Sequence, residues 1–218
     1  MLGFVGRNMD VGTSEDFLRR LVDAIVDNDD ALFKRLLDQS PALATASFAQ
    51  GATRQGPSLK ASFIKEIGHY IYSGDTALHF AAAAYRYKMA KQLIKAGAQL
   101  RAKNRRGSEP LHEAAFGSPG SHNWDPPAQA ATIVCLIEAG ADPNAQNMDG
   151  ATPLHRAVRT RCAGAVRALL DHGADPMIRN KNGSTAMQLV LNNTGRSGSG
   201  SPEAKAQQQE ILLLLKGK

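Results

Sequence analysis

Three histidines are the first residues in this sequence whose type and spacing suggest chemistry. His79, His112 and His155 each follow a leucine, and they are 33 and 43 residues apart. Histidine binds metal ions and acts as a general base, so a set of three has to be tested for both roles. The remaining histidines add no spacing typical of a zinc site: His69, His122 and His172. The motifs of nucleophilic hydrolases, phosphate-binding loops and zinc proteases are also missing, so no catalytic centre is indicated.

The histidines belong to a segment that recurs along the chain. Copies begin at Gly74, Gly107 and Gly150, and a weaker copy begins at Gly183. Their corresponding Leu or Met residues are 33, 43 and 33 residues apart, so the second unit contains ten extra residues: Leu78, Leu111, Leu154 and Met187. Thr152 before Pro153 is typical of a helix start, and a Gly such as Gly173 is typical of a helix end. Each unit is therefore predicted to contain two short amphipathic helices.

The repeated unit resembles the ankyrin repeat, whose pattern is G-x-T-P-L-H-x-A-A, then a second helix and L-L-x-x-G-A-D-x-N-A. Residues 150–182 match almost throughout, and the resemblance covers residues 74–191 strongly. It implies an all-α solenoid of about five helix-turn-helix repeats with β-turn or hairpin connections and inserted loops. It also implies that each repeated histidine is structural and bonds to the preceding turn or the neighbouring repeat. A solenoid of this kind has no deep pocket, so we predict a chain that is not an enzyme and has no cofactor or metal.

The resemblance gives a domain organisation. Residues 1–13 are predicted to be a tail, residues 14–44 a capping repeat rich in aspartate, and residues 45–73 an insertion or arm. Ankyrin repeats follow over residues 74–191, with the units 74–106, 107–149, 150–182 and the start of a last unit at 183–191. Residues 192–218 are predicted to form a Gly/Ser loop and a C-terminal capping helix.

Two insertions carry aromatic residues, and insertions in repeat proteins usually emerge as loops on one face. In the first, residues 45–73, the alternation of Tyr70 and Tyr72 indicates a strand-like arm or elongated hairpin. The second runs from Gly117 to about Pro127 and contains the only tryptophan, Trp124. This tryptophan either packs over a neighbouring helix or anchors a partner.

The chain has a formal charge of +6 and a pI near 9.5. Residues 1–44 carry a net charge of −3, which leaves +9 on residues 45–218. A basic body fits an anionic partner, or simply a charged face that keeps the protein soluble. The resemblance places binding on the concave face, at the turn tips and the exposed side of each first helix, where Phe116 and Gly117 are expected. Phe116 should be exposed or covered only by its own insertion. The candidate partner-binding residues are Tyr70, Tyr72, Arg105, Arg106, Phe116, Trp124, Met148, Arg156, Arg159 and Lys181.

The leading hypothesis is a protein-interaction module or scaffold with an acidic target. The runner-up is binding of nucleic acid or another polyanion through the same arginines, although no aromatic stacking series lies among the bases of residues 101–106. The least favoured class, an enzyme or small-ligand binder, requires a closed pocket beneath the Trp124 loop.

The rest of the composition concerns compartment and assembly. The sequence shows no secretory signal and no run of about 18 apolar residues. Cys135 and Cys162 lie far apart and are interpreted as buried free thiols. We therefore expect a cytoplasmic monomer without membrane insertion, and the composition resembles that of bacterial proteins.

Overall fold

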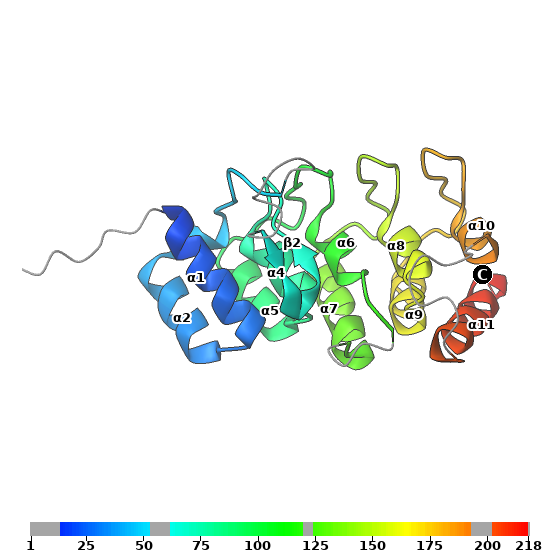
Figure 1. Cartoon of the computed structure of the whole chain (residues 1–218), viewed down its shortest axis with the longest axis horizontal. Helices are drawn as coiled ribbons and strands as arrows, with labels where there is room; N and C mark the ends of the chain where they lie inside the picture. Colours follow the sequence, from blue (N-terminus) through cyan, green and yellow to red (C-terminus); the bar gives the residue numbers. More distant parts are fainter. Residues whose placement is uncertain (1–13, 53–61, 120–123, 193–201, 218) are drawn as a thin grey trace, which may run out of the picture.

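Helix pairs follow one another along the long axis of the molecule in the computed structural model of the chain (Figure 1). The structure describes residues 14–52, 62–119, 124–192 and 202–217. These ranges contain five pairs: α1 (Ser14–Asp27) with α2 (Asp30–Gln39), α4 (Ala77–Ala83) with α5 (Tyr87–Lys95), α6 (Pro110–Ala114) with α7 (Pro126–Glu138), α8 (Pro153–Arg159) with α9 (Ala163–Asp171), and α10 (Ala186–Leu191) with α11 (Pro202–Lys216). The predicted all-α repeat solenoid is confirmed.

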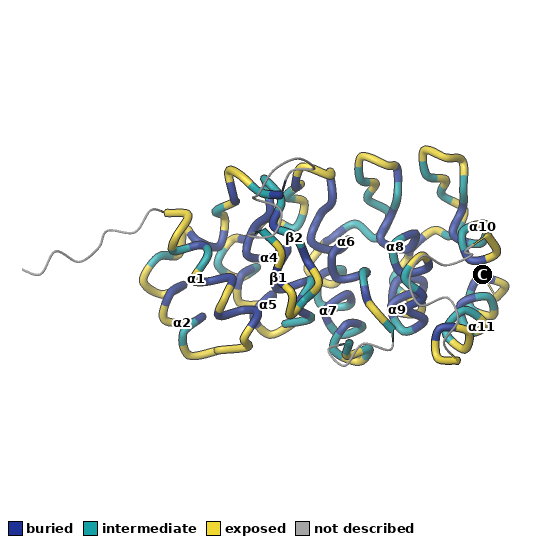
Figure 2. The backbone as a smooth tube through the Cα atoms, in the orientation of Figure 1, coloured by how far each residue is buried: buried dark blue, intermediate teal, exposed yellow. Residues whose placement is uncertain are grey.

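The helices form two layers with the hydrophobic core between them. The first helices pack in the order α1, α4, α6, α8 and α10, and the second helices α5, α7, α9 and α11 pack on one another in the same way. Figure 2 shows buried residues along the inside of the array and exposed residues on its outer turns. Phe33, Phe80, Leu111 and Leu154 are among the large side chains that are fully buried, each stabilising the fold by about 1.5–3 kcal/mol. Because each pair buries its apolar surface against its neighbours, stacking holds the array together.

A threonine and a histidine begin the first helix of a regular repeat. In α8, Thr152 is the N-cap, and its backbone N–H donates to Nδ1 of His155 at 3.2 Å. Because Nδ1 accepts, Nε2 carries the proton and donates to the carbonyl oxygen of Ser184 in the next repeat, at 3.0 Å. Two further histidines make the same bond to the following unit: His79 to Ser108 and His112 to Ala151. The predicted structural role of the repeated histidines is confirmed.

The first insertion folds into a short arm that lies beside α4. Strand β1 (Phe63–Ile64) pairs antiparallel with β2 (His69–Tyr70), and a 3-10 helix, η2 (Lys65–Ile67), joins them. Phe63 lies opposite Tyr70, and Ile64 lies opposite His69. Neighbouring residues of a strand point to opposite faces, so Ile64 and His69 are buried, while Phe63 and Tyr70 form an outer aromatic face. The predicted strand-like hairpin is confirmed. A second 3-10 helix, η1 (Pro41–Ala44), follows α2.

The second insertion begins earlier than the repeat pattern predicts. Helix α6 ends at Ala114, so Phe116 and Gly117 follow the helix, and the prediction that they lie on its exposed side is wrong. Gly117 is buried, and a Cβ atom at this position would lie 2.5 Å from Sγ of Cys162. Glycine allows this close approach, because any other residue here would displace the neighbouring side chains.

The same insertion also ends earlier than predicted. Helix α7 begins at Pro126, because the Asp125 side chain accepts the backbone N–H of Ala128 and a proline at the first position lacks only a donor that would be unpaired anyway. Pro126 and Pro127 therefore belong to the helix and not to the loop.

Parts of the predicted organisation lie outside the described residues: the tail 1–13, residues 53–61 of the first insertion, 120–123 of the second, and 193–201 of the Gly/Ser loop. Within the described ranges, no helix is long and apolar enough to cross a membrane. Both cysteines are free thiols, but the prediction of burial is right only for Cys162, because Cys135 is partly exposed.

Candidate functional site

Three tips connect successive repeats, and the tips before α8 and α10 project clearly beyond the helices on one side of the array (Figure 1). One asparagine builds each tip. Oδ1 of Asn147 accepts the backbone N–H groups of Asp149 at 2.9 Å and Ala151 at 3.0 Å. Gly150 has a φ of 68°, in the region that favours glycine. The same asparagine bonds define the other tips, at residues 104–107 and 180–183.

Backbone hydrogen bonds join the arm and the tips in a row. The N–H of Arg105 donates to the carbonyl oxygen of Ser73 at 2.7 Å, beside the arm. The N–H of Met148 donates to Arg106 at 3.0 Å, and the N–H of Lys181 donates to Asp149 at 3.0 Å. These bonds fix the spacing of the side chains that the tips carry.

Tyr72, at the end of the arm, lies close to two arginines of the first tip. The guanidinium carbons of Arg105 and Arg106 are 5.9 Å and 5.7 Å from the centroid of the Tyr72 ring, within cation–π range. The row of rings continues away from the arginines, because Tyr70 lies 6.4 Å from Tyr72 and 4.6 Å from Phe63. An aromatic series therefore does lie beside these bases. Reading residues 101–106 alone missed it, because the rings come from the inserted arm.

The other tips carry exposed side chains of mixed type. Met148 is 61% exposed in the second tip, and Lys181 is exposed in the third. Arg159 is exposed at the end of α8. Partial burial and the positive charges of Arg156 and Arg106 lower the pKa of Arg159.

Arg156 and Phe116 contact each other and are not freely exposed. The Arg156 side chain is 11% exposed, and its two terminal nitrogens donate to the two carboxylate oxygens of Glu113, each at 3.0 Å. Its guanidinium also lies 5.5 Å from the centroid of the Phe116 ring. The expectation that Phe116 is exposed or covered only by its own insertion is wrong, because Arg156 of the next repeat covers it.

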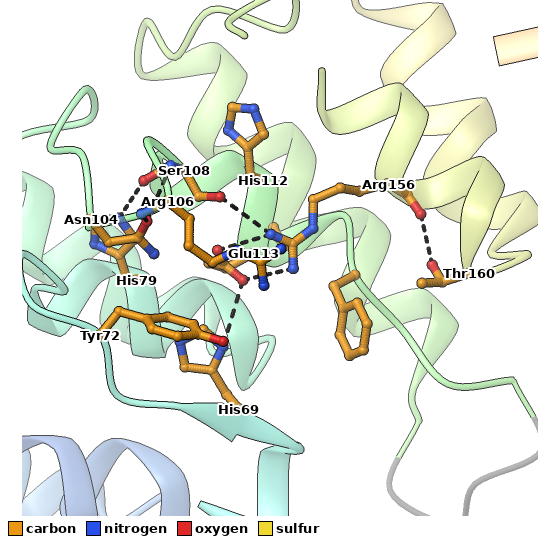
Figure 3. Close-up of polar contacts among 12 residues, drawn as sticks. His69, Tyr72, His79, Asn104, Arg106, Ser108, His112, Glu113, Arg156 and Thr160 are labelled. Carbon is orange, nitrogen blue, oxygen red and sulfur yellow. Dashed lines mark hydrogen bonds and ion pairs between the residues drawn. The ribbon is translucent and has the colours of Figure 1, made fainter. Parts of the chain in front are cut away.

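His69 of the arm lies between two buried carboxylates, and Figure 3 shows Glu113 between it and Arg156. Nε2 of His69 is 3.3 Å from Oδ2 of Asp75, and Nδ1 is 3.5 Å from Oε2 of Glu113. The sequence left His69 as a scattered histidine. Its partners come from different units of the array, and only the stacking of those units brings them to one point.

The charges of this cluster control its titration. Burial raises the pKa of Glu113, but the positive charge of Arg156, and next that of His69, outweigh it and lower the pKa to about 2. Burial, together with the charge of Arg156, lowers the pKa of His112 to about 4. Burial also lowers the pKa of His69, but the hydrogen bond to Asp75 and the charges of both carboxylates raise it above its ordinary value.

Trp124 is partly buried against the core. Its indole N–H donates to Oε1 of Gln129 at 2.9 Å, and Nε2 of Gln129 donates to the carbonyl oxygen of Ala114 at 3.0 Å. A groove of about 670 Å³ lies beside it, lined by residues of η2, the end of α4 and the loop after α6. The indole thus makes an internal contact that ties the second insertion to α7.

Two family models match the chain. The ankyrin repeat model matches residues 73–105, and a model described as ankyrin repeats in many copies matches residues 136–190. No curated protein matches the sequence. Among the described residues, no group of three or more His, Cys, Asp or Glu side chains could hold a metal ion. The stacked helix pairs, the repeated Thr–His caps and the two matches together show that the chain belongs to the ankyrin repeat family.

Proposed function

We propose that the chain is a protein-recognition module that binds an acidic segment of another protein. Ankyrin repeats are generally protein-interaction modules. The proposed binding surface, called the tip face below, consists of Tyr72, Arg105, Arg106, Met148, Arg159 and Lys181.

The observation that carries this proposal is the packing of two exposed arginines against Tyr72. Arginine and tyrosine are enriched among the residues that dominate binding energy at interfaces. Because the ring and the tip backbone already restrain these side chains, less conformational entropy is lost when a partner binds. Exposed Met148 adds an apolar contact between the first and third tips. The net charge of +9 on residues 45–218 favours an acidic partner.

Three other candidate residues make internal contacts. Arg156 is paired with Glu113 and covers Phe116, and Trp124 is bonded to Gln129. A partner that used these side chains would have to break those contacts. We therefore assign Arg156 and Phe116 to positioning the tip face, and Trp124 to holding the second insertion against α7, and none of them to contacting the partner.

A second candidate function is binding of single-stranded nucleic acid. The row Phe63, Tyr70 and Tyr72 ends at Arg105 and Arg106, and aromatic rings beside arginines are the elements on which bases stack and phosphates pair. This function predicts binding whose logarithm falls linearly and steeply with the logarithm of salt concentration.

The test is a charge reversal with a matched control. One variant carries Arg105→Glu, Arg106→Glu and Arg159→Glu, and the control carries Lys88→Glu, Lys91→Glu and Lys95→Glu, which are exposed on α5. Both change the net charge by the same amount. Fluorescence anisotropy measures binding of labelled poly-L-glutamate and of a labelled single-stranded oligonucleotide across salt concentrations.

We expect the tip-face variant to lose poly-L-glutamate binding at least tenfold more than the control, which corresponds to about 1.4 kcal/mol. Equal losses in the two variants would contradict the assignment of the tip face. Tight binding of the oligonucleotide with a steep salt slope, and none of poly-L-glutamate, would replace the leading function with the second.

A further inference from the structure

We propose that His69 is a positioning residue of the tip face, and that its protonation strengthens binding of an anionic ligand there. The inference rests on the proposed function and names a regulation of the same surface. Nothing in the repeat pattern calls for this residue, because it lies in the arm, outside the ankyrin units.

Asp75 links His69 to the first tip. Asp75, which is fully buried, contacts Nε2 of His69 and also accepts the backbone N–H of Tyr72 at 2.7 Å. Its other oxygen accepts Nδ2 of Asn104 at 2.9 Å. Oδ1 of Asn104 in turn accepts the backbone N–H of Arg106. The Asp75 carboxylate thus joins His69 to the backbone of Tyr72 and, through Asn104, to the tip that carries Arg105 and Arg106.

Glu113 links His69 to Arg156 of the next repeat. Nδ1 of His69 faces Glu113, whose carboxylate holds Arg156 through two bonds of 3.0 Å. Arg156 covers Phe116 and lies near Arg159. His69 also makes an edge-on contact with the Tyr72 ring, at 5.9 Å between centroids. His69 therefore contacts both carboxylates that position residues of the tip face, Asp75 and Glu113.

The buried cluster contains two carboxylates and two basic side chains. With His69 protonated, two cations, His69 and Arg156, balance the two carboxylates, Asp75 and Glu113. The other titratable or charged groups around this cluster are Tyr72 from the arm, His79 from α4, His112 from α6, and Tyr85 and Arg159 next to Arg156. Both of these histidines accept a backbone N–H at Nδ1 and bond a carbonyl oxygen through Nε2, as neutral rings do.

Loss of the His69 proton has two consequences, and both weaken binding of an anionic ligand. The buried cluster gains one net negative charge beneath the arginines, which lowers the positive potential of the tip face. A neutral ring also keeps a single N–H, so it cannot donate to both Asp75 and Glu113. The raised pKa of His69, caused by the two carboxylates against the effect of burial, puts this change above pH 6.5. Binding of an anionic ligand therefore weakens as pH rises.

The experiment measures binding of labelled poly-L-glutamate between pH 6.5 and 9 at constant ionic strength, where the probe stays fully ionised. The proteins are the wild type, His69→Gln, and the control His172→Gln, whose histidine lies at the end of α9. We expect affinity to fall about two- to fivefold over this range in the wild type and in His172→Gln, and to stay level in His69→Gln. A level profile in the binding-competent wild type, or an unchanged slope in His69→Gln, would overturn the inference.

A second measurement separates this inference from the proposed function. In the free wild type, NMR follows the His69 ring, the Tyr72 ring and the Asn104 side-chain amide during a pH titration. We expect all three to change with one midpoint above pH 6.5. If the Tyr72 and Asn104 signals do not follow His69, the coupling is refuted whether or not the probe binds. If they follow it and the probe binds at no pH, the proposed function fails while the coupling stands.

Discussion

The repeat formed by α8 and α9 and the junction between the arm and α6 hold their neighbours by different means. In the α8 repeat, Thr152 and His155 make neutral hydrogen bonds, and His155 reaches the next repeat through a single bond to Ser184. At the junction, His69 and Arg156 meet the buried carboxylates of Asp75 and Glu113. The cap of α8 is therefore held to the next repeat by neutral groups, whereas the junction is held by buried charged groups, one of which, Arg156, comes from α8 itself.

Neutral caps and buried charges are expected to respond differently to substitution. The neutral caps use only the Thr and His side chains and backbone groups, so they tolerate changes of surface side chains. Buried charges contribute less net stability, because desolvation offsets their attraction, but removing one partner leaves the others uncompensated. The junction is therefore where single substitutions have large effects, and it is also where the arm and the tip face meet.

The largest effect is expected from Glu113→Ala. This change leaves Arg156 and protonated His69 buried without their shared carboxylate, and it should lower the free energy of unfolding by about 3–5 kcal/mol. Urea denaturation measures it against Glu138→Ala, an exposed acid at the end of α7. A loss below about 1 kcal/mol would mean that the junction is no more sensitive than an ordinary surface.

The regular repeat should respond to loss of core volume. Leu154 is 1% exposed, and Leu154→Ala should cost about 2–5 kcal/mol through the cavity it leaves. Leu213→Ala is the control, because Leu213 is 72% exposed on α11. Thermal denaturation of both variants checks the prediction, and similar shifts in Tm would show that α8 is not packed as described.

A smaller effect on stability is expected when Glu109 is replaced by the threonine that other repeats have at this position. Glu109 occupies the N-cap of α6, where α4 and α8 have threonine, and its Oε2 atom is buried without a hydrogen-bond partner among the described residues. Burial raises the pKa of this carboxyl group. We expect Glu109→Thr to stabilise the protein by about 1 kcal/mol, and the reverse change, Thr152→Glu, to destabilise it. A drop in Tm for Glu109→Thr would show that its contact with Lys103 outweighs the unpaired oxygen.

The smallest expected effect is the pH dependence of stability. The raised pKa of His69 means that its contribution is complete below pH 6.5 and is lost as pH rises through its folded pKa. The lowered pKa values of His155 and of His112, about 4 for the latter, mean that their contributions are complete above pH 6.5 and are lost on acidification. Stability should therefore be greatest near pH 6.5.

Two substitutions test which histidine causes the alkaline decline and which the acidic decline of stability. His69→Gln should remove the alkaline decline, because the group that loses its proton there is gone. His155→Gln should reduce the acidic decline, and glutamine is a fitting replacement because Gln188 already takes the histidine's capping role in α10. Thermal denaturation across pH 4–9 measures both, and an alkaline decline that persists in His69→Gln would assign it to another group.

The sequence predicted the features that depend on local pattern. The Thr–Pro–Leu–His segments and the glycines that end the second helices specify helix pairs, and Tyr70 and Tyr72 specify an extended arm. It failed where contacts depend on how the units stack. Phe116 matched an exposed position by its place in the repeat, but α6 already ends at Ala114, and Arg156 of the next unit covers the ring.

The candidate site was likewise predicted only where it depends on local sequence. The resemblance to the ankyrin repeat placed candidate binding residues such as Arg105 and Met148 at the turn tips, but it did not predict the asparagine that builds each tip. Nothing local connects Tyr72 to those arginines or His69 to Glu113, because the arm's path over α4 decides both contacts.

Hydrogen–deuterium exchange with and without poly-L-glutamate tests the central claim, that the tip face binds acidic segments, most directly. We predict slower exchange at the tips, residues 103–108 and 147–150, and unchanged exchange in α5 and α9. Protection confined to α5 and α9, or no protection at a saturating concentration of the probe, would contradict the account.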